Sequence, residues 1–211
     1  QVSIAMVEGA VELVAYAIEI FQKNYPAIQF TLDVYGAQGV TDQVLATEVD
    51  FGITFNPPNN SALQLNRTLI YDLGIVMRPD HPLARKKSVT LIECAEYPQI
   101  LPGQALSIKH VLDRAWSRNL GGLPRGIAEV GSIDMIKALA LRGIGMGWLT
   151  SISALREILH GTLVFVPVED QSIDLFNFSI ISASGRILPQ PASLMIHQLV
   201  QIMENKNIQA I

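Results

Sequence analysis

Residues 78–86 have the sequence RPDHPLARK, in which Asp80 and His81 stand side by side between two prolines. An adjacent carboxylate and imidazole could act as general acid and base or contribute to a metal site. With the basic residues around them, they could also contact nucleic acid. Proline fixes φ and removes a hydrogen-bond donor, and an aspartate in a turn can bond to the local backbone. The same residues therefore also fit a purely structural turn.

The rest of the chain argues against chemistry at this stretch. No second histidine, cysteine or carboxylate stands at metal-ligand spacing from His81. The single cysteine, Cys94, lacks an activating partner nearby and fits a small core residue. The four histidines form no recognisable catalytic group with it: His81, His110, His160 and His197. We therefore predict a structural turn at Asp80-His81, no catalytic residue, no metal and no cofactor.

Composition limits the class of protein. Apolar residues make up 49% of the 211 residues and charged ones 16%, which suits one large domain or two small lobes with a large core. The net charge is −4, and the only basic run, Arg85-Lys86-Lys87, is too short for a phosphate-binding face. The chain has no bilayer-spanning stretch and no signal-peptide pattern, and its free cysteine fits a reducing compartment. We expect a cytoplasmic protein without membrane contact.

Hydrophobic periodicity predicts two α/β modules in series, with a strand and a helix left over. In the first module, strands over 1–6, 30–34 and 50–55 alternate with helices over 10–24 and 41–48. This order implies a parallel sheet with right-handed crossovers. The later strands are predicted over 69–77, 98–101, 127–130, 144–149, 163–168 and 175–183. The later helices are predicted after Thr90, which opens a capping box, after Ser107 as far as Gly121-Gly122, after Ser132, over 151–160 and after Pro191.

The helix over 10–24 is apolar on more than one side. One stripe consists of Val11, Val14, Ile18 and Phe21, and a second of Leu13, Ala17 and Ile20. A helix with two apolar stripes needs cover from its own sheet and from something else. The second stripe is therefore predicted to face a partner subunit.

Several ordered pieces of the chain resemble the effector-binding, or regulatory, domain of LysR-type transcriptional regulators. The resemblance extends over essentially the whole length. The pieces that carry it are Phe21 with Tyr25-Pro26, Glu48-Val49-Asp50-Phe51-Gly52-Ile53, Asp80-His81-Pro82-Leu83-Ala84, Glu129-Val130-Gly131-Ser132, Arg142-Gly143-Ile144-Gly145-Met146-Gly147, and the stretch from Leu159 to Val168.

The resemblance implies an α/β fold of the periplasmic-binding-protein-like type 2 class, with two Rossmann-like lobes. Lobe I would hold residues 1–72 and 176–211, and lobe II residues 73–175, joined by two crossover strands near 72–76 and 168–176. It also implies a homodimer, with a tetramer in the full-length protein. DNA would be bound only through an N-terminal winged helix-turn-helix, which is absent from this chain.

The expected ligand follows from the fold and from elementary electrostatics. Ligands of open α/β sheets bind at the carboxyl ends of strands, where helix N-termini point and attract anions. We expect a small effector, a carboxylate or an amino acid, bound between the lobes. The candidate ligand-binding residues at these ends are Val7, Glu8, Gln38, Thr54, Leu101, Pro102, Ser107, Ser132, Trp148 and Phe176.

Several candidates have more than one interpretation. Ser107 and Ser132 could cap helices alone, or could also face the ligand. Glu8 stands where many family members place Ser or Thr, and would repel a carboxylate, so the ligand could carry an amine or present an apolar part there. Trp148 could form an aromatic wall of the site or pack in the core.

Two other classes of protein compete with this prediction. A solute-binding protein of a transporter shares the implied fold, but the short chain, the free cysteine and the LysR-like motifs argue against it. An enzyme is disfavoured because no nucleophile, base or metal cluster can be identified.

Overall fold

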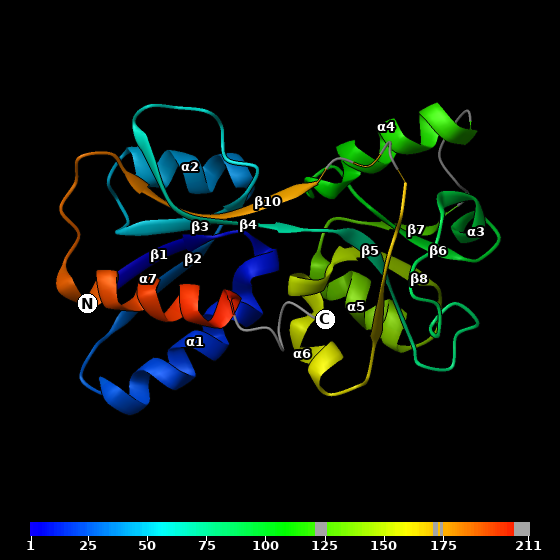
Figure 1. Ribbon diagram of the computed structural model, residues 1–211, viewed down its shortest axis with the longest axis horizontal. Helices are drawn as coiled ribbons and strands as arrows, with labels where there is room; N and C mark the ends of the chain where they lie inside the picture. Colours follow the sequence, from blue (N-terminus) through cyan, green and yellow to red (C-terminus); the bar gives the residue numbers. More distant parts are fainter. Residues whose placement is uncertain (121–125, 171–172, 174, 205–211) are drawn as a thin grey trace. The chain divides into compact units, whose positions relative to one another are not determined.

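The computed structural model describes residues 1–120, 126–170, 173 and 175–204, and the chain forms two units (Figure 1). Unit 1 consists of Gln1–Ile70 and Asn177–Ile211, and unit 2 of Tyr71–Phe176. Each unit has its own sheet and its own helices. The chain returns from unit 2 to unit 1 between Phe176 and Asn177. Residues 171, 172 and 174, shortly before this point, lie outside the described residues.

Unit 1 is built on a mixed five-stranded sheet with the strand order β2-β1-β3-β10-β4. Strand β1 pairs in parallel with both β2 and β3, whereas β10 runs antiparallel to β3. The carboxyl ends of β1, β2 and β3 therefore meet at one edge of the sheet. The strands are β1 (Val2–Met6), β2 (Phe30–Val34), β3 (Phe51–Phe55), β4 (Leu63–Tyr71) and β10 (Phe176–Ala183).

Helices cover both faces of this sheet (Figure 1). On one face lie α1 (Val11–Asn24) and α7 (Gln190–Met203), which pack against each other, and on the other lies α2 (Ala37–Leu45). A short 3-10 turn, η1 (Glu8–Ala10), leads from β1 into α1. A Cβ at Gly52 would lie only 2.7 Å from Val40 and 2.8 Å from Val44, so glycine lets α2 approach β3 closely.

The partner-facing stripe predicted on α1 is largely covered within unit 1. Leu13 and Ala17 are completely buried, and Ile20 is half-buried. Helix α7 packs against α1 within unit 1, and the sequence could not place the two side by side because they lie at opposite ends of the chain. The prediction that this stripe faces a partner subunit is therefore wrong for Leu13 and Ala17.

Unit 2 repeats the architecture, with the strand order β7-β6-β8-β5-β9. Strand β6 pairs in parallel with β7 and β8, and β5 runs antiparallel to β8 and β9. The strands are β5 (Leu73–Met77), β6 (Gln99–Pro102), β7 (Gly126–Val130), β8 (Met146–Thr150) and β9 (Val164–Pro167). The helices are α3 (Leu91–Ala95), α4 (Ile108–Leu120), α5 (Ile133–Leu141) and α6 (Leu155–Leu159), the last preceded by the 3-10 turn η2 (Ser151–Ala154).

Helix starts were predicted well where a capping side chain marks them. The Thr90 hydroxyl accepts from the Glu93 backbone and the Glu93 carboxylate accepts from the Thr90 backbone, so the predicted capping box is confirmed. Ser132 caps α5 as predicted. The helix predicted over 41–48 begins earlier, at Ala37, after an extended Gly36 that supplies no capping side chain. The predicted end of α4 at Gly121-Gly122 lies outside the described residues.

The first crossover strand was predicted too short. The sequence predicted a strand over 69–77, whereas β4 begins at Leu63 and is separated from β5 by Asp72. The early part of β4 lies at an edge of the sheet, and apart from the buried Leu63 and the exposed Leu65 its residues are polar and exposed or half-buried. Its hydrophobic pattern is accordingly weak, and pairing with β10 forms the strand instead.

Cys94 is buried in α3, and burial raises the pKa of its thiol to about 12. Since the thiolate is the reactive form, we expect native protein to resist a maleimide at neutral pH and denatured protein to react completely. Mass spectrometry of the two samples measures this difference. Rapid labelling of the native protein would contradict the burial.

Candidate functional site

In unit 2, the carboxyl ends of β6 and β7 lead into the N-termini of α4 and α5. The two strand ends are held together because the Gly103 backbone N–H donates to the Val130 carbonyl at 2.7 Å. At the start of α5, the Ser132 hydroxyl accepts from the Met135 backbone N–H at 3.4 Å. Two helix N-termini with their unpaired N–H groups and positive dipole ends therefore lie at one edge of this sheet.

Four of the predicted ligand-binding residues lie at this edge. Leu101 and Pro102, the last residues of β6, are buried, so their side chains pack under the surface at the end of this strand. Ser107 is exposed and directly precedes α4, and Ser132 is half-buried. Capping is thus shown for Ser132, which stays partly exposed.

In unit 1, three predicted residues follow the corresponding strand ends. Val7 is buried and its backbone N–H donates to the Ile53 carbonyl at 3.0 Å, which ties the end of β1 to β3. Glu8 is half-buried in the first turn after β1. Gln38, exposed in the first turn of α2, donates from its amide to the Asp42 carboxylate at 2.8 Å. Only Glu8 among these brings a formal charge to the edge.

The remaining candidates lie inside the units. Thr54 and Phe176 are completely buried, and the Thr54 hydroxyl donates to the Phe55 carbonyl at 3.4 Å. Trp148 is also completely buried, and its indole N–H donates to the Gln99 side-chain oxygen at 2.9 Å. Of the two interpretations of Trp148, core packing is the one that describes its position. An aromatic wall exposed to a ligand is not what this side chain forms.

Sequence reasoning missed a buried lysine beside the edge in unit 2. The Lys109 side chain, in the first turn of α4, is 6% exposed. Its ammonium group lies 3.3 Å from the Asp113 carboxylate and 3.6 Å from that of Glu129. The spacing of Lys109 and Asp113 predicts a helical ion pair, but Glu129 reaches the lysine only through the fold. The lysine charge is thus balanced by carboxylates of its own unit.

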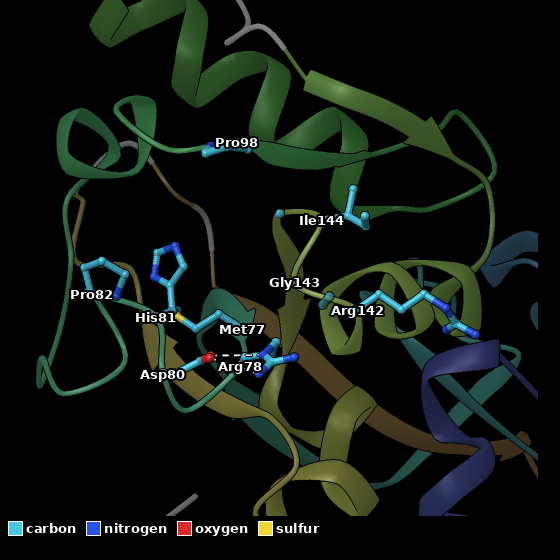
Figure 2. A pocket seen from close by; sticks show the side chains of 11 residues that line it. Met77, Arg78, Asp80, His81, Pro82, Pro98, Arg142, Gly143 and Ile144 are labelled. Carbon is cyan, nitrogen blue, oxygen red and sulfur yellow. Dashed lines mark hydrogen bonds and ion pairs between the residues drawn. The ribbon is translucent and has the colours of Figure 1, made fainter.

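The turn predicted at Asp80-His81 is confirmed, although its contacts differ from those expected. Asp80 accepts two bonds from the Arg78 guanidinium, at 3.0 Å and 2.9 Å, and these hold the pKa of its carboxyl below the ordinary value. The local backbone is bonded instead by His81, whose Nδ1 accepts from the Leu83 N–H at 3.2 Å. Figure 2 shows the two side chains on opposite sides of the turn.

The described residues lack both a metal-binding group and a membrane-spanning helix. No group of three or more histidine, cysteine or acidic side chains among them could hold a metal ion. In the same part of the chain, no helix has both the length and the apolar character needed to cross a bilayer.

Comparisons with known proteins agree on one family. Residues 1–204 match the family model of the LysR substrate binding domain. The regulator CbbR of Xanthobacter flavus is 24% identical over 198 residues, which are 90% of this chain and 59% of the relative. CysB of Haemophilus influenzae is 27% identical over 138 residues, 64% of this chain and 42% of the relative. The chain thus spans about half the length of the curated relatives it matches.

Solved structures with a similar fold are effector-binding domains. The regulatory domain of Synechocystis PCC6803 CcmR in complex with 2-PG superposes with a TM-score of 0.76 at 20% identity, covering 97% of each chain. The BenM effector-binding domain with benzoate gives a TM-score of 0.70 at 17% identity, and the match covers 98% of this chain and 93% of that domain. The predicted fold class, two α/β lobes of the periplasmic-binding-protein-like kind, is confirmed. The chain therefore belongs to the LysR substrate-binding domain family, which comprises effector-binding domains of transcriptional regulators and not enzymes.

Proposed function

We propose that this chain is the sensor of a LysR-type regulator that binds a small carboxylate or amino acid. The observation that carries the proposal is the edge of unit 2 where Ser107 and Ser132 stand at the N-termini of α4 and α5. Two helix N-termini and two hydroxyls suit a carboxylate, which accepts several hydrogen bonds. The benzoate bound by BenM is a ligand of this chemical class.

The charges at the strand ends of unit 1 and unit 2 limit the chemical class of the ligand further. Lys109 is balanced by two carboxylates, so it leaves no net positive charge beside α4. Glu8 brings a negative charge to the edge of unit 1. We propose that the carboxylate of the ligand binds at Ser107 and Ser132. In unit 1, Glu8 and Gln38 would suit a donor group such as an amine or hydroxyl. Five buried residues would pack behind these positions: Val7, Thr54, Leu101, Pro102 and Phe176.

A substitution at Ser132 tests the site. Ser132→Arg places a bulky side chain at the start of α5, so we expect effector affinity to fall by at least about tenfold. Thermal-shift screening of organic acids, aromatic acids and amino acids would first find a ligand, because stabilisation follows its concentration over its dissociation constant. Calorimetry then measures affinity for the variant. Since loss of the cap lowers stability by itself, affinity and not melting temperature is the deciding quantity.

The matched control is Ser193→Arg, an exposed position on α7. It adds the same charge far from the proposed site in the sequence and in a different unit. Equal affinity of the wild type and Ser132→Arg would place the effector elsewhere.

Coupling to DNA is proposed for the whole regulator, through a winged helix-turn-helix outside this chain. A ligand can shift a conformational equilibrium only by its difference in affinity for the two states. An effector that binds one conformation of this chain more tightly than another would favour that conformation, and this preference would be passed to the DNA-binding part. We therefore also propose that the protein acts in the cytoplasm, where such a regulator meets DNA.

A solute-binding protein of a transporter is the alternative that shares the fold. The curated relatives that match this chain are named as transcriptional regulators, which favours the sensor. The gene sequence upstream of the region encoding this chain separates the two: a winged helix-turn-helix supports the sensor, and a lipoprotein signal supports the transporter protein.

We propose that two copies pair through the edge strands of their sheets, with a tetramer in the full-length regulator. Strand β2 is one of the two edge strands of its sheet, as β7 is of the other sheet, and the two expose apolar side chains, among them Leu32, Val34 and Ile127. On the neighbouring helices Tyr16 and Met135 are also exposed. An exposed apolar strand edge is a natural pairing surface.

Sedimentation tests the pairing. Val34→Lys places a charge within the proposed contact, so we expect a wild-type dimer and a monomeric variant. The control Ile187→Lys alters a side chain that is 94% exposed in the loop before α7 and should leave the dimer intact. A stable wild-type monomer at micromolar concentration would contradict the proposal.

A further inference from the structure

Unit 2 contains a pocket of about 410 Å³ that takes no part in the proposed effector site. Its lining comes from three segments: the end of β5 with the turn after it, the residue before β6, and the link between α5 and β8. Figure 2 shows Met77, His81, Pro98 and Ile144 around the hollow, with Arg78 beneath it. Pockets for small molecules have volumes of roughly 300–1,000 Å³, so this one suits a compact ligand.

The pocket lies at the amino-terminal ends of β6 and β8, whereas Ser107 and Ser132 follow the carboxyl-terminal ends of β6 and β7. Pro98 directly precedes β6 and Gly145 directly precedes β8, so both mark the amino-terminal ends of parallel strands. Met77 is the last residue of β5, which runs antiparallel to β8 and therefore ends at the same edge. The proposed effector site uses the carboxyl-terminal ends of β6 and β7. A ligand here would thus bind independently of the effector.

The Arg78 guanidinium in this pocket is held in place. Asp80 accepts bonds from its Nε and from one terminal nitrogen, at 3.0 Å and 2.9 Å. The stem of Arg78 crosses Gly143, where an added Cβ would lie 3.2 Å from the Arg78 Cδ, and Gly143 has a φ of +71° that favours glycine. A guanidinium has five N–H groups, so three remain for another acceptor. Arg78 therefore presents oriented donors to the pocket.

His81 supplies a second donor of fixed position. Its Nδ1 accepts from the Leu83 backbone, so a neutral ring carries its proton on Nε2. Burial lowers the pKa of His81, although the Asp80 carboxylate opposes this shift, so the ring is neutral at pH 7. The imidazole ring also packs against the Tyr97 ring, with 4.9 Å between their centres. The ring is thus a donor whose orientation is set on two sides.

The lining offers donors without an excess of negative charge. Arg78 and Asp80 offset each other and His81 is neutral, while Arg142 extends away from the hollow and its Nη1 donates to the Ala138 carbonyl at 3.0 Å (Figure 2). The other named walls, such as Met77, Pro98 and Ile144, are apolar. An anion with an apolar body matches both features, because its charge would meet the donors and its body the walls.

We propose that this pocket is a second small-molecule site, which binds a compact monocarboxylate with an apolar body, such as an aromatic acid. The carboxylate would accept from Arg78 and from the Nε2–H of His81. The apolar body would lie between Pro98 and Ile144.

Methionine methyl groups provide a direct readout. Met77 lines the pocket, whereas Met195 is buried in α7 of unit 1 and serves as a remote reference. In protein labelled with ¹³C-methyl methionine, titration with benzoate should shift the Met77 signal saturably and leave Met195 in place. Absence of a Met77 shift at any benzoate concentration that leaves the protein folded would overturn the proposal.

Two charge variants distinguish binding from a structural role. Arg78→Gln removes the main donor, so benzoate affinity at Met77 should fall about tenfold to a hundredfold. Asp80→Asn removes a competing negative charge and should strengthen binding by about twofold to tenfold. If both variants weakened binding alike, the ion pair would only maintain the turn. Ile144→Asp, at a 43% exposed position, gives a further weakening variant should Arg78→Gln fold poorly.

Two further titrations test whether the pocket is separate from the effector site and which class of ligand it binds. Ser132→Arg should leave the Met77 titration unchanged, because the two edges of the sheet are independent sites. Loss of the Met77 shift in that variant would mean that benzoate acts through the effector site. Inorganic phosphate should bind at least about tenfold more weakly than benzoate, because it lacks an apolar body. Equal binding of phosphate would reduce the pocket to a plain anion site and contradict the proposed ligand class.

Discussion

Replacing Asp50 by alanine is expected to lower the free energy of unfolding by about 2–4 kcal/mol, because a buried charge network loses its central acceptor. One Asp50 oxygen accepts from the Ser3 backbone at 2.9 Å and from its hydroxyl at 3.1 Å. The other oxygen accepts from the Arg186 guanidinium at 3.2 Å. Asp50 therefore joins the start of β1, the start of β3 and the loop between β10 and α7.

The size of this effect follows from what is left behind. The Arg186 side chain is 29% exposed and keeps bonds to the Thr47 and Val49 carbonyls, so its charge is only partly stranded. Asp33→Ala is the matched control, since Asp33 is exposed on the edge strand β2, and should change stability by less than about 0.5 kcal/mol. Urea denaturation of the whole chain measures the free energy of unfolding of both variants. Equal stability of the Asp50→Ala and Asp33→Ala variants would show that the network contributes nothing.

Replacing Trp148 by phenylalanine is expected to destabilise unit 2 by about 2–4 kcal/mol, from a small cavity and an unpaired buried oxygen. The Gln99 side chain is completely buried and bonds to two groups. Its amide N–H donates to the Cys94 carbonyl at 2.7 Å and its oxygen accepts from Trp148. The shorter ring cannot replace the indole N–H, so the Gln99 oxygen would be left buried without its partner.

The chain offers a close control in Trp116. Trp116 and Trp148 are both completely buried and meet edge to face, with 6.0 Å between ring centres. The Trp116 indole N–H, unlike that of Trp148, finds no hydrogen-bond partner among the described residues. Trp116→Phe therefore removes an unsatisfied donor as well as volume, and should cost less than about 1 kcal/mol. If chemical denaturation found the two variants equally unstable, volume alone would explain both.

The sequence predicted most elements because their patterns are local. The stripe of Val14 and Phe21 marks α1, and the hydroxyls of Thr90 and Ser132 mark the starts of α3 and α5. The elements that were misplaced lack such patterns. Helix α2 begins without a capping side chain, and the polar first half of β4 exists only because β10 pairs with it.

The candidate site could be predicted only in part. Strand order and helix starts place Ser107 and Ser132 at one edge of unit 2, and both follow from position along the chain. Burial does not follow in this way. From the sequence, Trp148 could equally line a ligand site or pack in the core. Its burial and its hydrogen bond to Gln99, 49 residues away, show that it packs in the core.

By itself the sequence determined the family, the two-module α/β order, most helix starts and the turn at Asp80-His81, because each depends on neighbouring residues or on ordered motifs. The tertiary structure alone decided that α7 packs against α1, that Lys109 lies beside Glu129, and that Pro98 lines a pocket with Met77 and Ile144. Each of these joins segments distant in sequence. Such contacts arise from how whole elements pack, so no local pattern of residue types records them.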